Sequence, residues 1–424
     1  MTGRVLRVPG DKSISHRALL LAALADGESR IDGVLTGADV QSTATALRAL
    51  GCAVPPLAVD QTLRIHGLGL NGMHAPADTI HCGNSGTTAR LLLGILAGQP
   101  IAATMTGDAS LRARPMRRVT GPLGRMGAGF DELGEPDRLP LRVRGGRLVP
   151  LDYASPHASA QVKSALLLAG VTGGARVVVT EPHLSRDHTE RMLRAQGVNL
   201  DAFVADGRPG VAITPPARLE PLDVRVPGDF SSAAFFLALG ALTVATPLRI
   251  AGVGVNPTRT GLLRVLERMG VHVERTAERL EGGEPVADLT VQRASLRGTT
   301  IEPDEVPALI DELPVVAVLG ARAEGTTIVR GAGELRLKET DRIRALVGNL
   351  RALGVEALES DDGMTVTGTD TPLRGRVRAC GDHRIAMAFG VLGAEARSAI
   401  EIDDPSVVGI SFPDFWAQLR AHAG

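Results

Sequence analysis

The chain has 424 residues, of which 44% are hydrophobic, and a formal net charge of −1 at pH 7. This length and apolar content suffice for two sizeable cores, and the near-zero charge with only 2% aromatic residues argues against nucleic-acid binding. The longest apolar stretch, residues 233–245, is shorter than the roughly 18 residues that span a bilayer, and residues 1–11 lack the apolar core of a secretion signal. We therefore expect a cytoplasmic protein that does not enter a membrane.

The cysteine content points the same way. The chain has three cysteines, an odd number, and their positions do not show the spacing of metal ligands. Small buried thiols in a reducing compartment fit this pattern better than a disulfide framework. We expect neither a metal nor a cofactor.

Two segments of the chain begin with the same five residues. Arg-Val-Pro-Gly-Asp occurs at residues 7–11 and again at residues 225–229, each time before a run of small and apolar residues. Gly-Asp-x-Ser in this position predicts a helix N-terminus, whose free N–H groups and positive dipole end suit an anion. Only the first copy adds a lysine and an arginine, Lys12 and Arg17. The sequence therefore predicts a duplicated fold in which the first copy binds an anion and the second keeps packing residues.

A shorter pattern lies within this duplication. A leucine followed four residues later by a glycine closes a helical stretch at residues 47–51, 123–127, 193–197, 266–270 and 350–354, and the chain ends on a related segment at Gly424. Each predicts a helix that ends in a glycine and is followed by a strand. The glycines are 70 to 84 residues apart, which is too long for a solenoid repeat. We therefore expect six small α/β units, three in each half.

Polar segments precede several apolar helical stretches in the first half. A glycine-rich turn at residues 83–90 would bring backbone N–H groups close to an anionic oxygen. Residues 106–118 contain four arginines in a turn-rich segment, and residues 159–164 and 185–190 are polar loops before helices. Each of these segments, taken alone, is equally consistent with a capped helix or a surface ion pair.

The second half contains three comparable segments. Asp311 and Glu312 open a very apolar run, which is an unusual place for two carboxylates, and further charged groups occur at residues 337–342 and 381–384. Lysine is rare in the chain, because all but three of the 46 basic residues are arginine. A compact ammonium group suits proton transfer or contact with a single oxygen. The three lysines, Lys12, Lys163 and Lys338, therefore become candidates for a site.

Seven of these segments, in this order, resemble the motifs of the 5-enolpyruvylshikimate-3-phosphate synthase family. The resemblance implies a two-domain inverse α/β barrel built from six βαβαββ units, three per domain. It places the first domain at residues 11–227, the second at residues 1–10 with 228–424, and the active site in the cleft between the two domains. The segments are Gly-Asp-Lys-Ser-Ile-Ser-His-Arg at residues 10–17, Gly-Asn-Ser-Gly-Thr-Thr at 83–88, Arg114-Pro115, Ser-Ala-Gln at 159–161, Arg-Asp-His-Thr-Glu at 186–190, Leu-Lys-Glu-Thr-Asp-Arg at 337–342 and Asp-His-Arg at 382–384.

The family's reaction transfers the enolpyruvyl group of phosphoenolpyruvate to the 5-hydroxyl of shikimate 3-phosphate and releases phosphate, on the route to chorismate and aromatic amino acids. Both substrates are polyanions, so a local positive potential is needed although the net charge is near zero. The resemblance implies that shikimate 3-phosphate is bound by Lys12, Ser13, Arg17, Ser159, Ala160, Gln161, Arg186, Asp311 and Lys338. It implies that phosphoenolpyruvate is bound by Lys12, Asn84, Gly86, Arg114, Gln161, Arg342 and Arg384.

The same resemblance suggests which groups move protons. C3 of phosphoenolpyruvate must gain a proton while C2 gains the shikimate oxygen, and the resulting tetrahedral intermediate must then lose phosphate. We expect Asp311 to take the proton of the 5-hydroxyl. Glu339 and Lys12 would deliver protons to the carbon and to the departing phosphate. The neighbours of Asp311 and Glu339 in the sequence suggest environments that move their pKa values apart.

One departure from the family and two alternative functions remain. Many relatives have a lysine two residues before Phe412-Pro413, where this chain has Ile410, so one phosphoenolpyruvate contact is missing or supplied elsewhere.

The nearest alternative function is a UDP-N-acetylglucosamine enolpyruvyl transferase, which carries a reactive cysteine in a loop that corresponds to residues 107–115, where this chain has none. The other is a non-catalytic phospholigand-binding or RNA-binding protein, suggested by the arginines alone. We expect a monomer whose only partners are small-molecule substrates.

Overall fold

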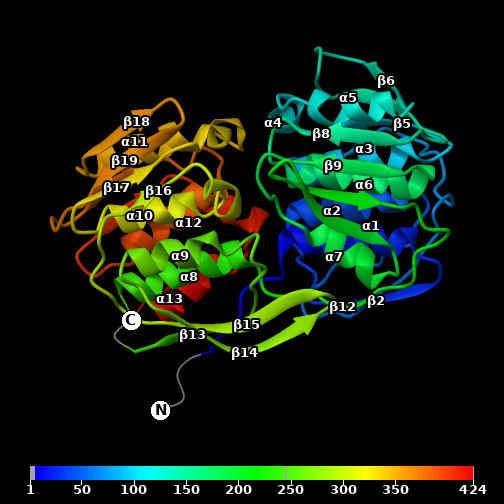
Figure 1. Cartoon of the computed structure of the whole chain (residues 1–424). Coiled ribbons are helices and arrows are strands. Elements are labelled where there is room, and N and C mark those ends of the chain that lie inside the picture. The colour runs from blue at the N-terminus through cyan, green and yellow to red at the C-terminus, as the bar shows by residue number, and fades with distance from the viewer. Residues whose placement is uncertain (1–4, 244–245, 424) are drawn as a thin grey trace. The chain divides into compact units, whose positions relative to one another are not determined.

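The computed structural model describes residues 5–243 and 246–423. The chain forms two compact units, and Figure 1 labels most of their helices and many of their strands. The first unit contains Gly10–Val226 together with Glu281–Glu284, and the second contains the residues up to Pro9, Pro227–Leu280 and Pro285–Gly424. Each unit has a hydrophobic core of its own.

The first unit contains three sheets, with strand orders β12-β2-β3, β4-β5-β7-β6 and β10-β11-β9-β8. Its strands are β2 (Glu28–Asp32), β3 (Leu63–His66), β4 (Ile80–His81), β5 (Ala102–Thr106), β6 (Gly129–Glu132), β7 (Leu141–Arg144), β8 (Leu151–Ala154), β9 (Val177–Thr180), β10 (Leu200–Ala205), β11 (Arg208–Ile213) and β12 (Asp223–Arg225). Its helices are α1 (Lys12–Leu24), α2 (Ala38–Ala49), α3 (Gly86–Ala97), α4 (Ala109–Arg112), α5 (Arg117–Arg125), α6 (Ala160–Gly173) and α7 (His188–Ala195).

The second unit also contains three sheets, with orders β1-β13-β15-β14, β16-β17-β19-β18 and β20-β21. Its strands are β1 (Val5–Leu6), β13 (Leu248–Gly254), β14 (Val273–Glu281), β15 (Glu284–Val291), β16 (Thr300–Ile301), β17 (Thr326–Val329), β18 (Ala357–Ser360), β19 (Gly363–Thr367), β20 (Arg374–Val377) and β21 (Ala399–Ile402). Its helices are α8 (Phe230–Leu242), α9 (Gly261–Arg268), α10 (Leu313–Gly320), α11 (Arg342–Ala352), α12 (His383–Gly393) and α13 (Phe415–His422), with 3₁₀ turns η1 (Val306–Ala308), η2 (Gly333–Leu337) and η3 (Pro405–Ile410).

One parallel strand pair recurs in every sheet. β4 pairs with β5, β8 with β9, β16 with β17 and β20 with β21, and in each case one helix lies between the two strands in the sequence. The other two pairs exchange partners, because β1 precedes α1 but pairs with β13, whereas β12 precedes α8 but pairs with β2. The chain therefore passes from one unit to the other after β1 and again after β12, beside the two copies of Arg-Val-Pro-Gly-Asp.

The helices of each unit fall into two classes. The helices inside the parallel repeats, α1, α3 and α6 in the first unit and α8, α10 and α12 in the second, are buried along nearly their whole length. All 13 residues of α8 are buried, for example. The second helix of each repeat buries one face only, as α9 does with Leu262, Val265 and Leu266. Helices thus fill the interior of each unit and sheets lie outside them, which confirms the inverse α/β arrangement.

Five of the predicted helix ends are confirmed. α2, α5, α7, α9 and α11 all stop two residues before the expected glycine, and each of these glycines has a positive φ, from 82° at Gly197 to 108° at Gly127. A side chain would strain this left-handed conformation, so glycine marks the end of the helix. The sixth glycine, Gly424, lies outside the described residues.

Four repeats have the full βαβαββ order and two are shorter. The first sheet contains β3 where two strands were expected after α2, and β20 and β21 form a sheet of two strands in the described part of the chain. Residues 52–62, which follow α2, form no strand with β3 in this region. After β21 the described residues contain η3 and α13 and no further strand. Within residues 5–243 and 246–423, no helix combines the length and apolar character required to cross a bilayer.

Candidate active site

The N-terminal turns of the inner helices gather polar groups. In the first unit, the caps are Asp11, Ser85 and Ser159, whose side chains accept the N–H groups of Ile14, Thr88 and Val162. Asp229 caps α8 in the same way, so both copies of Gly-Asp-x-Ser begin a helix as predicted. Each capped end still presents free N–H groups and a positive dipole end, which favour an anion.

Arg17 links three helices of the first unit. From the second turn of α1, its Nε donates to Thr189 Oγ1 on α7 at 2.7 Å and its Nη2 donates to Ser164 Oγ on α6 at 2.8 Å. Its Nη1 donates to the carbonyl oxygen of Ser13 at 2.9 Å. Burial lowers the pKa of Arg17 to about 10, and the charges of Glu190 and Asp11 oppose this effect, so the guanidinium remains positive at neutral pH. The hydrogen bonds fix one cation at the start of α1.

Lys12 lies at the first position of α1 and is paired with a carboxylate. Its Nζ lies 3.0 Å from Asp39 Oδ2, and the two side chains are 17% and 12% exposed. Asp39 belongs to the first turn of α2. The ammonium group is therefore held at a helix N-terminus while its partly exposed position keeps it reachable.

Asn84, Gly86 and Arg114 meet at the N-terminus of α3. Arg114 Nη2 donates to Asn84 Oδ1 and, at 3.2 Å, to Ser110 Oγ. A Cβ at Gly86 would lie 3.0 Å from Arg90 Nη1 and 3.3 Å from Arg114 Nη1, so both guanidinium groups approach this backbone closely. Within the described part of the chain, the buried Nε of Arg114 has no hydrogen-bond acceptor. Two guanidinium groups and a donor without an acceptor suit a carboxylate or phosphate ligand.

Gln161 joins this group from α6. Its Oε1 accepts from Arg90 Nη1 at 2.7 Å and its Nε2 donates to Thr87 Oγ1 at 3.0 Å, so α3 and α6 are connected at their first turns. Ser159 and Ala160 occupy the cap and the first position of α6. Arg186 precedes α7, and its charge contributes to lowering the pKa of Arg17 after the larger effect of burial, which indicates that the two cations are close.

In the second unit, Asp311 lies among three cations. Its Oδ1 is 3.4 Å from Lys338 Nζ and 3.5 Å from Arg342 Nη1, and its Oδ2 is 3.8 Å from Arg384 Nη2. Arg384 Nη1 also donates to the carbonyl oxygen of Asp311 at 3.1 Å. The four side chains come from the turn before α10, the segment before α11, the start of α11 and the start of α12. The fold thus brings together residues that are up to 73 positions apart.

Two further carboxylates, those of Asp382 and Glu339, hold the guanidinium of Arg342. Its Nε donates to Asp382 Oδ2 at 2.7 Å and its Nη2 donates to Glu339 Oε2 at 2.7 Å. Burial lowers the pKa of Arg342, but the attraction of Asp382, Glu339 and Asp311 outweighs burial and raises it above its ordinary value. Asp382 itself is fully buried and caps α12 through the N–H of Arg384. Asp382 therefore holds the side chain of Arg342 and the backbone of Arg384.

Each unit thus assembles its own part of the predicted residue set. The first unit brings together Lys12, Ser13, Arg17, Asn84, Gly86, Arg114, Ser159, Ala160, Gln161 and Arg186 around the N-termini of α1, α3, α6 and α7. The second unit brings together Asp311, Lys338, Glu339, Arg342 and Arg384 around the N-termini of α10, α11 and α12.

Several contributing residues were not singled out from the sequence. Arg90 lies at the end of the glycine-rich motif and Asp382 within the Asp-His-Arg motif, so both could have been included from those motifs. Asp39 had no signal, because it pairs with Lys12 across 27 positions. Ile410, which replaces the lysine of many relatives, is the last residue of η3.

The second copy of Gly-Asp-x-Ser carries more charge than its sequence suggested. Ser231 on α8 donates to Glu312 Oε1 and accepts from Arg259 Nη2 at 2.7 Å. Arg259 also lies 3.7 Å from Asp229 and 3.8 Å from Glu312, and all of these side chains are at least nine-tenths buried. The helix therefore does not keep packing residues alone, and Glu312 pairs with Arg259 whereas the neighbouring Asp311 faces Lys338, Arg342 and Arg384.

Comparison with known proteins agrees with this arrangement. The family model described as EPSP synthase (3-phosphoshikimate 1-carboxyvinyltransferase) matches residues 1–419. The 3-phosphoshikimate 1-carboxyvinyltransferase of Citrifermentans bemidjiense is 46% identical over 410 residues, covering 97% of this chain and 94% of the relative. That of Geobacter sulfurreducens is 49% identical over 414 residues, covering 98% of this chain and 95% of the relative.

Solved structures give the same result. EPSP synthase from Acinetobacter baumannii superposes with a TM-score of 0.86 at 39% identity, covering 99% of this chain and 95% of that one. The enolpyruvyl transferase NikO from Streptomyces tendae has a TM-score of 0.79 at 21% identity, covering 99% and 94% of the two chains, and supports the fold alone. The chain therefore belongs to the EPSP synthase (3-phosphoshikimate 1-carboxyvinyltransferase) family of enolpyruvyl transferases.

Proposed function

We propose that the chain transfers the enolpyruvyl group of phosphoenolpyruvate to the 5-hydroxyl of shikimate 3-phosphate and releases phosphate. The observation that carries this proposal is the pair of cation sets at inner helix N-termini, one set in each unit, in a chain that belongs to this family. Two polyanionic substrates require such local positive charge, which a net charge of −1 conceals. We propose that both sets act on the same pair of substrates.

Shikimate 3-phosphate would be bound mainly by the first unit. The first turns of α1 and α6 offer N–H groups to the phosphate, and Lys12, Arg17 and Arg186 offer charge. Ser13, Ser159, Ala160 and Gln161 provide hydroxyl, backbone and amide groups suited to the ring hydroxyls. Asp311 and Lys338 of the second unit would complete this set.

Phosphoenolpyruvate would be bound by guanidinium groups from both units. Arg114, with Asn84, Gly86 and Gln161 nearby, suits one anionic end of the molecule, and Lys12 adds a point charge. Arg342 and Arg384 suit the other end, because a guanidinium can donate two parallel hydrogen bonds to a carboxylate. The hydrogen bonds of Arg342 to Asp382 and Glu339 would orient it before the substrate binds.

The addition step of this chemistry needs two proton transfers. Asp311 would accept the proton of the 5-hydroxyl while the oxygen bonds to C2 of phosphoenolpyruvate, and three cations lie around its side chain. Glu339 would supply the proton that C3 gains in this step. The tetrahedral intermediate would then return a proton from C3 to Glu339 while the bond between C2 and the phosphate oxygen breaks. Lys12 would deliver a proton to the departing phosphate. We further propose that the chain works as a cytoplasmic monomer and does not bind nucleic acid.

The test is phosphate release from phosphoenolpyruvate with shikimate 3-phosphate or UDP-N-acetylglucosamine as acceptor. We expect release with shikimate 3-phosphate only, and its loss in Lys12→Met. Arg176→Met is the matched control, because Arg176 is an exposed cation whose Nη1 lies 3.0 Å from Asp152 Oδ1. Release with the sugar nucleotide would instead support the sister transferase, and no release with either acceptor would contradict the proposal.

A further inference from the structure

Arg114 belongs to a short connecting segment whose position needs an explanation. It lies between α4, which ends at Arg112, and α5, which begins at Arg117. The residue at the N-cap of α5 is Met116, whose side chain makes no capping hydrogen bond. The first N–H groups of α5 therefore depend on an acceptor from elsewhere in the chain.

Asp137, in the loop between β6 and β7, supplies this acceptor. Its Oδ1 accepts the N–H of Arg117 and, at 3.1 Å, the N–H of Met116, and its carbonyl oxygen accepts the N–H of Met116 at 2.8 Å. An aspartate 20 positions further along the chain thus caps α5 from outside. The segment that carries Arg114 is tied to this loop at its last residue.

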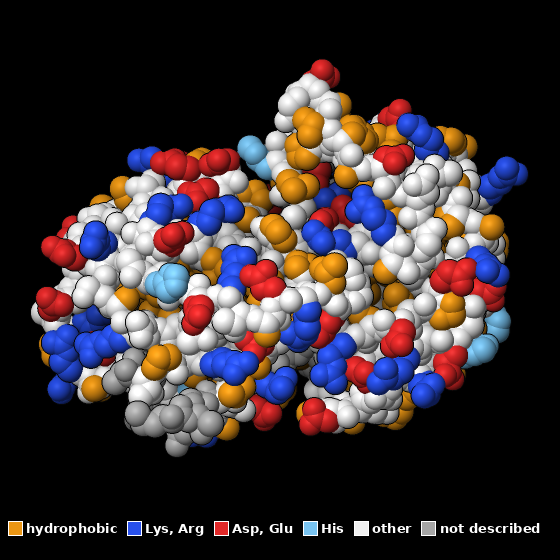
Figure 2. Space-filling model, turned by 60° about the horizontal axis from the view of Figure 1, so that its bottom comes forward, with side chains coloured by type: hydrophobic (Ala, Val, Ile, Leu, Met, Phe, Trp, Pro, Cys, Tyr) orange, Lys and Arg blue, Asp and Glu red, His pale blue; other side chains and the backbone are white. Residues whose placement is uncertain are grey.

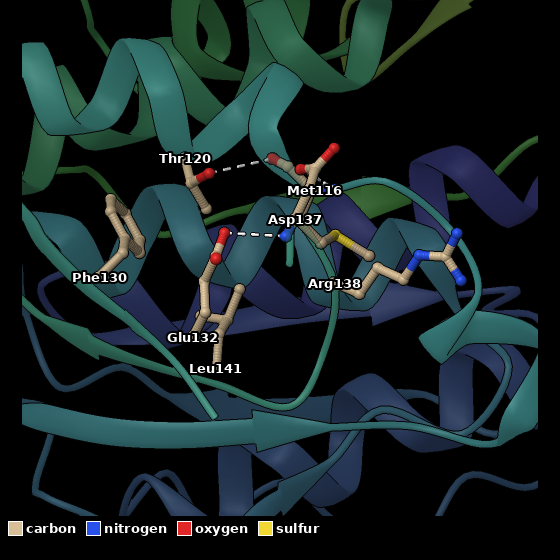
Figure 3. A pocket seen from close by; sticks show the side chains of 7 residues that line it. All are labelled: Met116, Thr120, Phe130, Glu132, Asp137, Arg138 and Leu141. Atoms are coloured by element: carbon tan, nitrogen blue, oxygen red, sulfur yellow. Dashed lines mark hydrogen bonds between the residues drawn. The ribbon is translucent and has the colours of Figure 1, made fainter. Parts of the chain in front are cut away.

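The backbone of Asp137 adopts a conformation that few residue types tolerate. Its φ is 63°, in the left-handed region that aspartate, asparagine and glycine tolerate better than other residues. Its own N–H donates to Glu132 Oε1 at 2.8 Å, as Figure 3 shows. Glu132 also lies 3.8 Å from the guanidinium of Arg117. The loop is therefore shaped by hydrogen bonds that converge on Asp137 and the start of α5.

Packing holds one side of this segment, because Met116 is buried and belongs to the core of the first unit, whereas Asp137 borders open space. Asp137, Glu132 and Met116 line a pocket of about 240 Å³ together with Thr120, Phe130, Arg138 and Leu141, which Figure 3 shows from close by. Because one side of Asp137 faces this space, side-chain contacts do not enclose it. The hydrogen bonds of Asp137 then act together with the packing of Met116 to fix where the backbone of residues 115–117 lies.

That backbone leads directly to the candidate substrate contacts. The carbonyl oxygen of Pro115 accepts from Arg90 Nη2 at 3.3 Å, and Arg114 donates to Asn84 and Ser110. A shift of this segment would move the guanidinium of Arg114 and also the carbonyl oxygen of Pro115, which accepts a hydrogen bond from Arg90. A guanidinium must be placed within a fraction of an ångström to bind a carboxylate or phosphate through two hydrogen bonds.

We propose that Asp137 is a positioning residue for Arg114 and thereby sets the affinity for phosphoenolpyruvate, an inference that rests on the function proposed above. Asp137 acts through the backbone of Met116 and Arg117 and does not touch the substrate. Its effect therefore falls on binding of phosphoenolpyruvate, and the proton transfers at Asp311 and Glu339 are unchanged.

Three variants separate the parts of this proposal. Asp137→Gly keeps the left-handed backbone and removes the side-chain acceptor, and it should raise KM for phosphoenolpyruvate by about three- to tenfold, as loss of a hydrogen bond to this segment predicts. Asp137→Asn keeps both the acceptor oxygen and the backbone preference, and it should stay within about twofold of the wild type. Arg138→Ala changes the neighbouring exposed side chain of the same pocket, and it should leave KM unchanged.

In Asp137→Gly, kcat and KM for shikimate 3-phosphate should match the wild type, and the amides of Met116 and Arg117 should exchange with solvent faster. An unchanged KM for phosphoenolpyruvate, or an equal rise for both substrates, would overturn the proposal. The same holds if Asp137→Asn behaves like Asp137→Gly. If the wild type forms no product, the proposed function fails, and the exchange rates with calorimetric phosphoenolpyruvate binding still test the role of Asp137 separately.

Discussion

Lys163 on α6 and Glu190 on α7 form an almost fully buried ion pair, with 2.9 Å between Nζ and Oε1. Glu181 shares the same ammonium group at 2.7 Å, and the carbonyl oxygen of Ser185 accepts from it at 3.3 Å. Burial lowers the pKa of Lys163, but the two carboxylates outweigh burial and raise it. One of the three lysines of the chain thus connects α6 to α7 and to the loop before Arg186.

Lys163→Met should destabilise the protein strongly. It would leave Glu181 and Glu190 buried beside each other without their cation, and breaking a buried pair in this way typically costs about 3–5 kcal/mol. Urea unfolding of the variant and the wild type measures this difference. Arg176→Met is the control, because the exposed pair of Arg176 with Asp152 should contribute at most about 1 kcal/mol. Equal losses in the two variants would contradict the structural role of Lys163.

Gly86→Ala should weaken phosphoenolpyruvate binding selectively. The new Cβ would press on Arg90 Nη1 at 3.0 Å and Arg114 Nη1 at 3.3 Å, so both guanidinium groups must move. We expect KM for phosphoenolpyruvate to rise by about tenfold, equivalent to about 1.4 kcal/mol, while binding of shikimate 3-phosphate is retained. Gly124→Ala on α5 is the control, because a Cβ there meets nothing within 4 Å. A comparable effect from both variants would show that contact with the arginines is not the cause.

Asp311→Asn should separate binding from turnover. The amide is nearly isosteric, so affinity for shikimate 3-phosphate should remain close to that of the wild type, whereas loss of a general base should lower kcat by about 10²- to 10⁴-fold. Calorimetric binding and steady-state phosphate release measure the two effects. Asp304→Asn, which changes an exposed carboxylate before η1, should alter neither. Turnover near the wild-type value in Asp311→Asn would rule out Asp311 as the base.

His16 should make the protein less stable in acid. Burial lowers the pKa of His16 to about 3 from its ordinary value of 6.5, although Asp39 opposes the shift. The unfolded chain therefore binds a proton below about pH 6.5 that the folded chain does not bind until about pH 3, so stability falls across this window. The contribution of this one group approaches about 1.4 kcal/mol per pH unit.

His16→Asn tests this contribution. Asparagine can keep a polar atom near Thr43 Oγ1, which lies 2.7 Å from His16 Nδ1, but it does not titrate. Urea unfolding between pH 4 and pH 7 should give a smaller slope of stability against pH for the variant than for the wild type. Identical slopes would show that His16 does not carry this pH dependence.

The elements that could be predicted are those whose signals lie within a few residues. Asp11 and Asp229 mark helix starts because each side chain caps an N–H group three residues later. Gly127 and Gly197 mark helix ends because the left-handed backbone excludes most side chains. Most candidate site residues came instead from the family resemblance, whose motifs carry them at these helix starts.

Other features gave no local signal. The exchange of β1 and β12 between the two units cannot be read from either strand, because a strand of two or three residues has no distinctive pattern. Asp39 and Asp137 resemble ordinary surface acids in the sequence. Their roles depend on partners 27 and 20 positions away, Lys12 and Arg117.

The sequence alone therefore determined the sixfold repetition, five helix ends and the helix starts at Asp11 and Asp229, because backbone sterics and capping act over one turn of chain. Only the tertiary structure decided which charges meet. Asp311 acquires its three cations, and Arg90 its contact with Gln161 across 71 positions, only when the inner helices pack. Packing depends on the shapes of whole helices, and no short segment specifies it.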